Sequence, residues 1–139
     1  PAALNDLVTV YQELLSSFPA ELIAIGGSSA GGNLTLATVL RLKELSVSLP
    51  GSLFVGTPNA DLLLTGDTII TNEYVDNTLP TVEGVTRAAA KLYAGDFDLK
   101  NPLISPLYGD YVGFPPHLFG LGHSGFIVER CGQSSSKIR

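Results

Sequence analysis

The chain has 139 residues, which is enough for one domain with a hydrophobic core and too few for two of ordinary size. Hydrophobic residues make up 45% of it and charged residues only 15%, well below the roughly 25% of an average soluble domain, so we expect much of its surface to be buried in a larger structure. A net charge of −5 and the absence of a basic stripe exclude nucleic acid and anionic membranes as expected partners.

Two helices and a strand are predicted in the first third of the chain. Apolar residues recur at helical spacing from Leu4 to Phe18, and Pro19 ends the pattern. The short apolar run at 22–25 predicts a strand buried on both faces. Apolar residues between 34 and 42 cover nearly every side of a second helix, which is therefore expected to be buried.

Three further elements follow along the chain. Residues 52–55 predict a second buried strand, and residues 117–121 predict a third. Between them, apolar residues at 85–92 predict an amphipathic helix that Thr81 begins and Gly95 closes. This alternation of strands and helices predicts an α/β fold with a parallel sheet, whose flanking edge is exposed and apolar because three strands make a thin sheet.

The segment Gly27-Ser28-Ser29-Ala30-Gly31 lies between a predicted strand and a predicted helix, and it has the spacing G-x-S-x-G. A sharp strand-to-helix turn would hold the Ser29 hydroxyl clear of the sheet, and side chains at 27 and 31 would then collide with neighbouring backbone. The N–H of Ala30 would lie at a helix N-terminus, where it can donate to an oxyanion. We therefore interpret Ser29 as a nucleophile, Ala30 N–H as an oxyanion-hole donor, and Gly27 and Gly31 as the small residues of a nucleophile elbow.

Two other interpretations of this turn stay open, namely a bend without chemistry and a phosphate cradle. The cradle is disfavoured because no Lys follows the glycines as a P-loop needs, and because the G-x-G-x-x-G spacing is not met. No acidic residue ends a second strand where a dinucleotide ribose would require one. Because no cluster of Cys, His and carboxylates has metal-ligand spacing, we expect no metal and no cofactor.

Four segments together resemble the bacterial hormone-sensitive-lipase-like esterases: PAALNDLVTVYQELL, GGSSAGGNL, TNEYVDNTL and LYAGDFDLKNPLISPLYGDYVGFPP. The resemblance runs from Pro1 to about Gly122 and implies a partial α/β-hydrolase fold, with three layers, a parallel sheet and flanking helices, that misses the N-terminal strands and the C-terminal end. It also implies a carboxylic ester hydrolase acting on small-molecule short-chain esters or lactones, with Ser29 as the nucleophile of an acyl-enzyme mechanism. The family's elbow usually reads G-D-S-A-G-G, so Ser28 stands where the family has Asp.

The same resemblance indicates which catalytic parts this chain does not carry. The family's H-G-G-G oxyanion loop does not occur in the sequence, the position of the triad Asp falls on Gly125, and no residue matches the triad His. We therefore expect little or no turnover by this chain. The alternative is a non-catalytic pseudogene remnant or a fragment that requires a partner, and its exposed apolar edge leads us to expect self-association or aggregation.

We divide the chain into a partial hydrolase domain at 1–122 and a non-native tail at 123–139. One permitted choice of codons for 123–134, shifted by one nucleotide, reads T-R-D-L-L-L-S-D-V-V-R, which is the continuation that the family leads us to expect. The hypothesis is that a frameshift near His123 has made this tail.

The other candidate residues are interpreted as structural. Nothing in the sequence arranges His117 or His123 as a base, and Cys131 has only Arg130 as a basic neighbour. The carboxylates assigned to loops and caps are Asp61, Asp67, Asp76, Asp96, Asp98 and Asp110. No signal segment opens the chain and no run of about 18 apolar residues occurs, so we expect a cytoplasmic protein.

Overall fold

The structure is a computed structural model that describes residues 1–66, 84–121 and 125–129. Its helices are α1 (Ala2–Leu14), α2 (Ala30–Glu44) and α4 (Val85–Ala94), and its strands are β1 (Ala24–Ser28), β2 (Ser52–Gly56), β3 (His117–Leu121) and β4 (Gly125–Glu129). Two short 3-10 turns lie at Ala20–Leu22 and Pro106–Tyr108.

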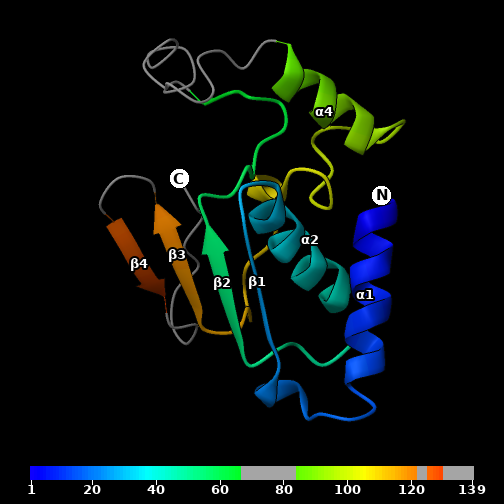
Figure 1. Cartoon of the computed structure of the whole chain (residues 1–139), viewed down its shortest axis with the longest axis vertical. Helices are drawn as coiled ribbons and strands as arrows, with labels where there is room; N and C mark the ends of the chain where they lie inside the picture. The colour runs from blue at the N-terminus through cyan, green and yellow to red at the C-terminus, as the bar shows by residue number, and fades with distance from the viewer. Residues whose placement is uncertain (67–83, 122–124, 130–139) are drawn as a thin grey trace.

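The strands form one sheet in the order β1-β2-β3-β4 (Figure 1). β1, β2 and β3 are parallel, with Gly26 opposite Phe54 and Phe54 opposite Leu118, so the predicted parallel sheet is confirmed. β4 runs antiparallel to β3. The sequence predicted no strand at 125–129, which lies in the segment that we assigned to a non-native tail, and the boundary at residue 122 stays a prediction.

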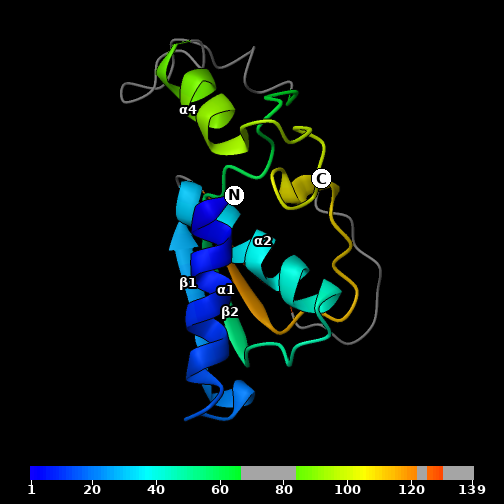
Figure 2. The same cartoon turned by 90° about the vertical axis from the view of Figure 1, so that its right-hand side faces the viewer.

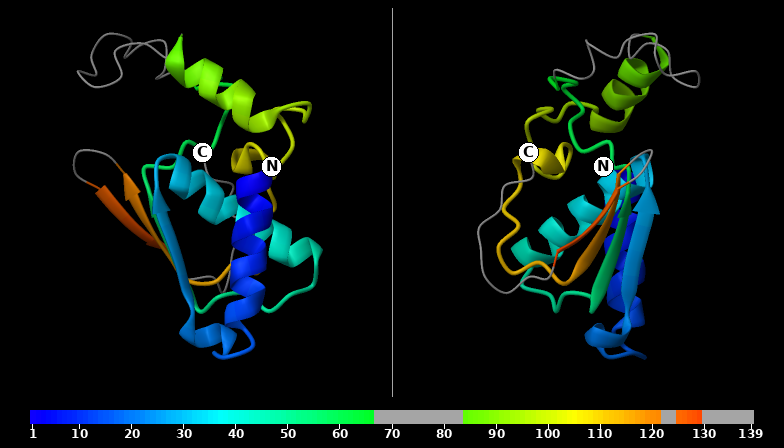
Figure 3. Two further views of the ribbon diagram at one scale, coloured as in Figure 1. Left: turned by 45° about the vertical axis from the view of Figure 1, so that its right-hand side comes forward. Right: turned by 90° about the vertical axis from the view of Figure 1, so that its left-hand side faces the viewer.

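Both α1 and α2 lie on the same face of the sheet, in one layer (Figures 1 and 3). α2 packs on the sheet through Leu36 and Val39, which form a buried cluster with Leu53 and Val55. On its other side α2 contacts a second buried cluster from α1, whose members are Leu4, Val8 and Tyr11. The predicted burial of α2 is confirmed, because one side of the helix packs on the sheet and another side packs on α1.

The prediction for β1 was wrong in its bounds and in its burial. The strand begins at Ala24 and ends at Ser28, and Leu22 belongs to a 3-10 turn where it is 75% exposed. Residues of β1 alternate between exposed and half-buried, since helices cover only one face and β1 is the end strand of the described sheet. An apolar run in the sequence therefore does not mark a strand buried on both sides here.

The helix α4 confirms one prediction and adds a finding. Gly95, with φ of 56°, closes it as expected. Its buried residues are Ala90 and Ala94, whereas Val85 and Leu92 are 83% and 87% exposed. The apolar residues that revealed the helix thus lie mostly on its outer side. None of the described helices is long and apolar enough to cross a bilayer.

Candidate active site at the strand-to-helix turn

The turn between β1 and α2 places Ser29 at the carboxyl end of a parallel strand and directly before a helix. Its backbone has φ of 55° and ψ of −117°, a combination that residues with a side chain rarely adopt. The side chains of Ser28, Ser29 and Ala30 are exposed. This is the sharp turn with an outward hydroxyl that the G-x-S-x-G spacing predicted, while the role of Ser29 as a nucleophile stays a prediction.

Three backbone hydrogen bonds fix this conformation. The N–H of Ser29 donates to the carbonyl of Gly56 at 2.8 Å. The carbonyl of Ser29 accepts from the N–H of Asn33 at 3.1 Å and from the N–H of Asn59 at 3.2 Å. Because β2, the loop after it and α2 each contribute one bond, the surroundings determine the strained φ of Ser29.

The side chain of Asn33 is a second connection that sequence reasoning missed. It is 4% exposed, and its Nδ2 donates to the carbonyls of Asn59 at 2.8 Å and of Ile104 at 2.9 Å. Asn33 thereby ties the first turn of α2 to two segments that are distant in sequence. The signal in the sequence was a polar residue in the first turn of a helix that we expected to be buried.

The glycines of the elbow are not equivalent. A Cβ on Gly27 would lie 2.4 Å from the carbonyl oxygen of Gly31, so no larger residue fits at 27 without movement of the backbone. A Cβ on Gly31 would meet nothing within 4 Å, so our prediction that position 31 must be small for the same reason was wrong. Gly32, which we did not single out, has less room for a side chain than Gly31, since a Cβ on Gly32 would lie 3.0 Å from Pro58.

The start of α2 is where the predicted oxyanion-hole donor, the N–H of Ala30, would lie. The first N–H groups of α2, including that of Ala30, have no acceptor within the helix and lie beside the exposed Ser29. The Ser29 hydroxyl makes no hydrogen bond to a residue that the structure describes. Its neighbour differs, because Ser28 Oγ lies 3.4 Å from Thr57 Oγ1. The turn therefore offers a hydroxyl and a donor but no base among the described side chains.

His117 is too far from Ser29 to act as that base. It lies at the start of β3, in register with Leu53 and, through Leu53, with Ile25. Ile25 precedes Ser29 by four residues, which is about 13 Å at roughly 3.3 Å per residue of strand. The ring is buried and its Nδ1 lies 2.8 Å from the carbonyl oxygen of Pro115, so the structural interpretation of this histidine is confirmed.

The carboxylates serve local turns, as expected. Asp61, Asp98 and Asp110 each accept a backbone N–H from two residues further along the chain. Gly125, the position that the resemblance assigns to the triad Asp, begins β4 opposite Leu121 and supplies no carboxylate. Within the described ranges no group of three His, Cys or acidic residues could hold a metal ion.

Asp110 belongs to an anchor between α2 and the segment before β3. Lys43 Nζ donates to the carbonyls of Asp110 at 2.8 Å and of Val112 at 2.7 Å, and it lies 3.3 Å from the Asp110 carboxylate. The hydrogen bond from the Val112 N–H, together with Lys43, holds the pKa of Asp110 below its usual value. The anchor is remote from the elbow in sequence and has a structural role.

Several residues that the sequence singled out lie outside the described residues. They are Asp67, Asp76, Thr81, His123 and Cys131.

Comparisons with known proteins agree with this geometry. The family described as alpha/beta hydrolase fold matches residues 1–130. An esterase from Acinetobacter venetianus is 32% identical over 93% of this chain and 43% of its own length. The crystal structure of esterase E25 is 53% identical, with a TM-score of 0.81 over 86% of this chain and 36% of that one. An esterase from the bacterial hormone-sensitive lipase family is 36% identical, with a TM-score of 0.77 over 86% of this chain and 40% of that one.

The chain spans less than half of the length of these relatives. The chain therefore belongs to the alpha/beta hydrolase fold family and is similar to the bacterial hormone-sensitive-lipase-like esterases within it.

Proposed function

We propose that this chain derives from a serine carboxylic ester hydrolase in which Ser29 is the nucleophile. The observation that carries the proposal is the backbone of Ser29, with its positive φ, its exposed side chain and its position between a parallel strand and a helix. Membership of a family whose similar members are esterases supports it. The substrates would be small-molecule esters with short acyl chains, or lactones.

The chemistry follows from the parts at the turn. Ser29 Oγ would attack the ester carbonyl carbon, the alcohol would leave, and water would then hydrolyse the acyl-enzyme to free acid and serine. The N–H of Ala30 would donate to the oxygen that becomes negative when the carbonyl is attacked. A serine hydroxyl is protonated at neutral pH and is a weak nucleophile, so the attack requires a base that removes its proton.

We propose that the chain by itself turns over little or no ester. The described residues hold no base near Ser29, and Gly125 occupies the proposed position of the triad acid. Loss of the base from such a triad lowers kcat on the order of a million-fold. Hydrolysis by this chain is therefore expected at the rate of buffer alone.

Two assays test these two statements separately. The purified 139-residue chain is expected to hydrolyse p-nitrophenyl acetate no faster than its Ser29→Ala variant does. Clear turnover that Ser29→Ala abolishes and Ser28→Ala leaves intact would refute the proposed inactivity. Ser28 is a matched control, because it is the adjacent exposed serine on the same turn.

A chimera tests the nucleophile itself. Residues 1–121 of this chain would replace the matching segment of esterase E25, which is 53% identical and supplies the rest of the fold. We expect the chimera to hydrolyse the ester, Ser29→Ala to lower kcat by about a thousandfold or more, and Ser28→Ala to leave it within a small factor. A folded chimera whose activity does not depend on Ser29 would refute the assignment.

A second candidate role, a non-catalytic fragment that requires a partner, is favoured by the surface. Val10, Phe18 and Leu22 are 55%, 53% and 75% exposed, and β1 has a neighbour on only one side in the described sheet. Apolar side chains beside an open strand edge favour association. Sedimentation of the isolated chain is expected to show self-associated species, and a monodisperse monomer at all concentrations would contradict this role.

A further inference from the structure

Thr57, the residue directly after β2, has a backbone conformation that residues of its kind rarely adopt. Its φ is 35°, and a positive φ is a genuine outlier for a branched side chain. Ser28 and Gly56 are paired in register, so Thr57 and Ser29 follow neighbouring strands at the same end of the sheet. Both residues thus have a strained backbone at one edge, and such strain persists only where the surroundings impose it and concentrates at functional sites.

Residues 56–59 pass along the elbow and bond both sides of Ser29. The carbonyl of Gly56 accepts the N–H of Ser29 at 2.8 Å, and the N–H of Asn59 donates to the carbonyl of Ser29 at 3.2 Å. Thr57 lies between these two contacts in the chain. The φ of Thr57 therefore helps to set the course of the segment that holds Ser29 from two sides.

The branched Cβ of Thr57 restricts that rotation more than its hydroxyl does. Positive φ is a narrow range for any residue with a Cβ, whereas glycine moves through it freely. The Thr57 hydroxyl lies 3.4 Å from Ser28 Oγ, longer than the roughly 2.7–2.8 Å of an ordinary O–H···O bond, so it contributes little. The N–H of Thr57 donates to the carbonyl of Gly120 on β3 at 2.6 Å and fixes the strand side of the residue.

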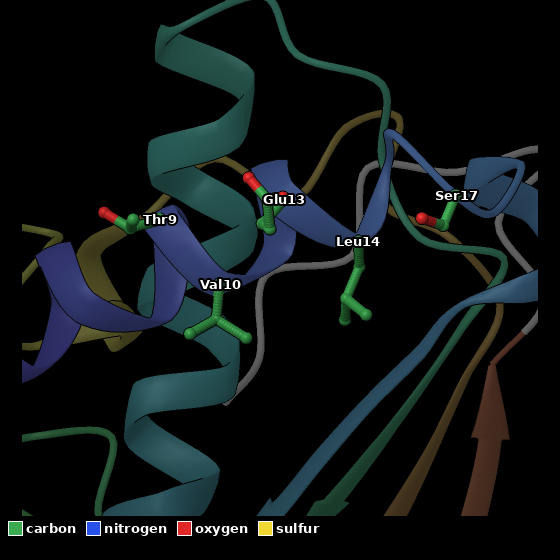
Figure 4. Close-up of a pocket in the computed structure, with 5 residues that line it drawn as sticks. All are labelled: Thr9, Val10, Glu13, Leu14 and Ser17. Carbon is green, nitrogen blue, oxygen red and sulfur yellow. The ribbon is translucent and has the colours of Figure 1, made fainter.

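A pocket does not provide this positioning. The pocket that lies along α1 has a volume of about 380 Å³, and no residue that lines it belongs to β2, α2 or the segment 56–59. Its lining residues, drawn in Figure 4, are Thr9, Val10, Glu13, Leu14 and Ser17. The described groups that hold the Ser29 backbone are peptide groups of the neighbouring chain.

We propose that Thr57 is a positioning residue for Ser29. Its narrow range of φ keeps residues 56–59 on the course in which both peptide groups of Ser29 are bonded, and this fixes the direction of the Ser29 hydroxyl. The inference rests on the proposed role of Ser29 as the nucleophile, and Thr57 itself touches no reacting atom. Because a misplacement of about 1 Å can lower a rate by about a hundredfold, a looser segment should lower kcat and change KM little.

Kinetics of the chimera with esterase E25 measure this effect. Thr57→Gly should lower kcat by about tenfold, with KM within about twofold of its starting value. Thr57→Val keeps the branched Cβ and removes the hydroxyl, so it should lower kcat by less than about threefold. A residue that contributes only to stability would change neither constant in molecules that are folded at the assay temperature.

Ser46→Gly is the matched control, because Ser46 is a second exposed hydroxyl residue with a positive φ, of 54°. Ser46 lies just beyond the far end of α2, and Figure 2 shows this helix leading away from the carboxyl end of β1. Both glycine substitutions relieve a positive φ, so each should raise the Tm of the 139-residue chain by about 4 °C. Only Thr57→Gly should lower kcat of the chimera, and Ser46→Gly should leave it within about twofold.

Hydrogen exchange in the 139-residue chain tests the inference without any activity. Thr57→Gly should speed exchange at the amides of Ser29 and Asn59 by about tenfold, because their bonds open more often. The amide of Leu53, which is hydrogen-bonded near the start of β2, is the internal control and should change by less than about twofold. Ser46→Gly should leave all three amides unchanged.

Other results overturn the inference. They are an unchanged kcat or a lowered Tm with Thr57→Gly, equal losses of kcat with Thr57→Gly and Ser46→Gly, a loss with Thr57→Val as large as that with Thr57→Gly, and unchanged exchange at the amides of Ser29 and Asn59. The proposed function fails separately, when a folded chimera is inactive or is active without Ser29. In that case the exchange result still decides whether Thr57 holds the backbone of Ser29.

Discussion

The substitution Gly27→Ala tests the geometry of the elbow most directly. The added Cβ would lie 2.4 Å from the carbonyl oxygen, 2.5 Å from the carbonyl carbon and 2.8 Å from the Cα of Gly31. All three are backbone atoms of the first turn of α2, so the turn has to open by about 1 Å to reach an ordinary contact, and we expect a loss of about 2–3 kcal/mol in the free energy of unfolding.

Gly31→Ala is the matched control, because it makes the same chemical change four residues away. Its Cβ would meet nothing within 4 Å, and alanine is favoured over glycine inside a helix by about 0.5–1 kcal/mol, so we expect a gain of that size. The two variants should therefore differ in sign.

Thermal and urea unfolding followed by far-UV circular dichroism measure both effects. At about 4 °C per kcal/mol for a domain of this size, Gly27→Ala should lower Tm by about 8–12 °C and Gly31→Ala should raise it by about 2–4 °C. The urea m-value should stay unchanged if only the native state is affected. Equal shifts, or a neutral Gly27→Ala, would refute the close approach of the strand and the helix at this turn.

Three other perturbations have expected outcomes. Asn33→Ala removes the donor to the buried carbonyl of Ile104 and to the part-buried carbonyl of Asn59, and it should lower the free energy of unfolding by about 2–4 kcal/mol in a urea titration. Ser29→Gly relieves a positive φ and should raise Tm, which corresponds to a gain of about 1 kcal/mol in the free energy of unfolding. Its control, Ser28→Gly, lies at a strand position and should lower Tm. A fall in Tm with Ser29→Gly would show that the turn is unstrained. The N–H of Val112 lowers the pKa of Asp110, and a lowered native pKa contributes stability that is present above the unfolded pKa and lost as the pH falls through the native value. Asp110→Asn should therefore flatten the dependence of Tm on pH below about pH 4, and an unchanged profile would contradict this role.

The turn was predictable from the sequence because its constraints are local. Gly27 and Gly31 are four residues apart, and the positive φ belongs to Ser29 itself. The parallel order of the strands followed from the alternation of apolar runs and a helix, and 117–121 matched β3 in full. In each of these cases the residues that interact are close in sequence or follow a regular period.

Predictions that depended on distant partners were the ones that changed. Pro58 is the residue that leaves little room for a side chain at Gly32. The buried side chain of Asn33 needs the carbonyl of Ile104 as its hydrogen-bond acceptor. Periodicity detected α4 but not its orientation, since small Ala90 and Ala94 face the protein while larger apolar residues lie outside. No local pattern reports which segment lies against a given side of a helix.

The sequence by itself determined that a strained serine lies between a strand and a helix, because only glycine permits the close approach that the turn requires. The tertiary structure decided which surfaces are open, because burial depends on whether another element is present to cover an apolar face. It thereby left the edge of β1 and the side of α1 that carries Val10 and Leu14 exposed, and it kept His117 at the opposite end of the sheet from Ser29.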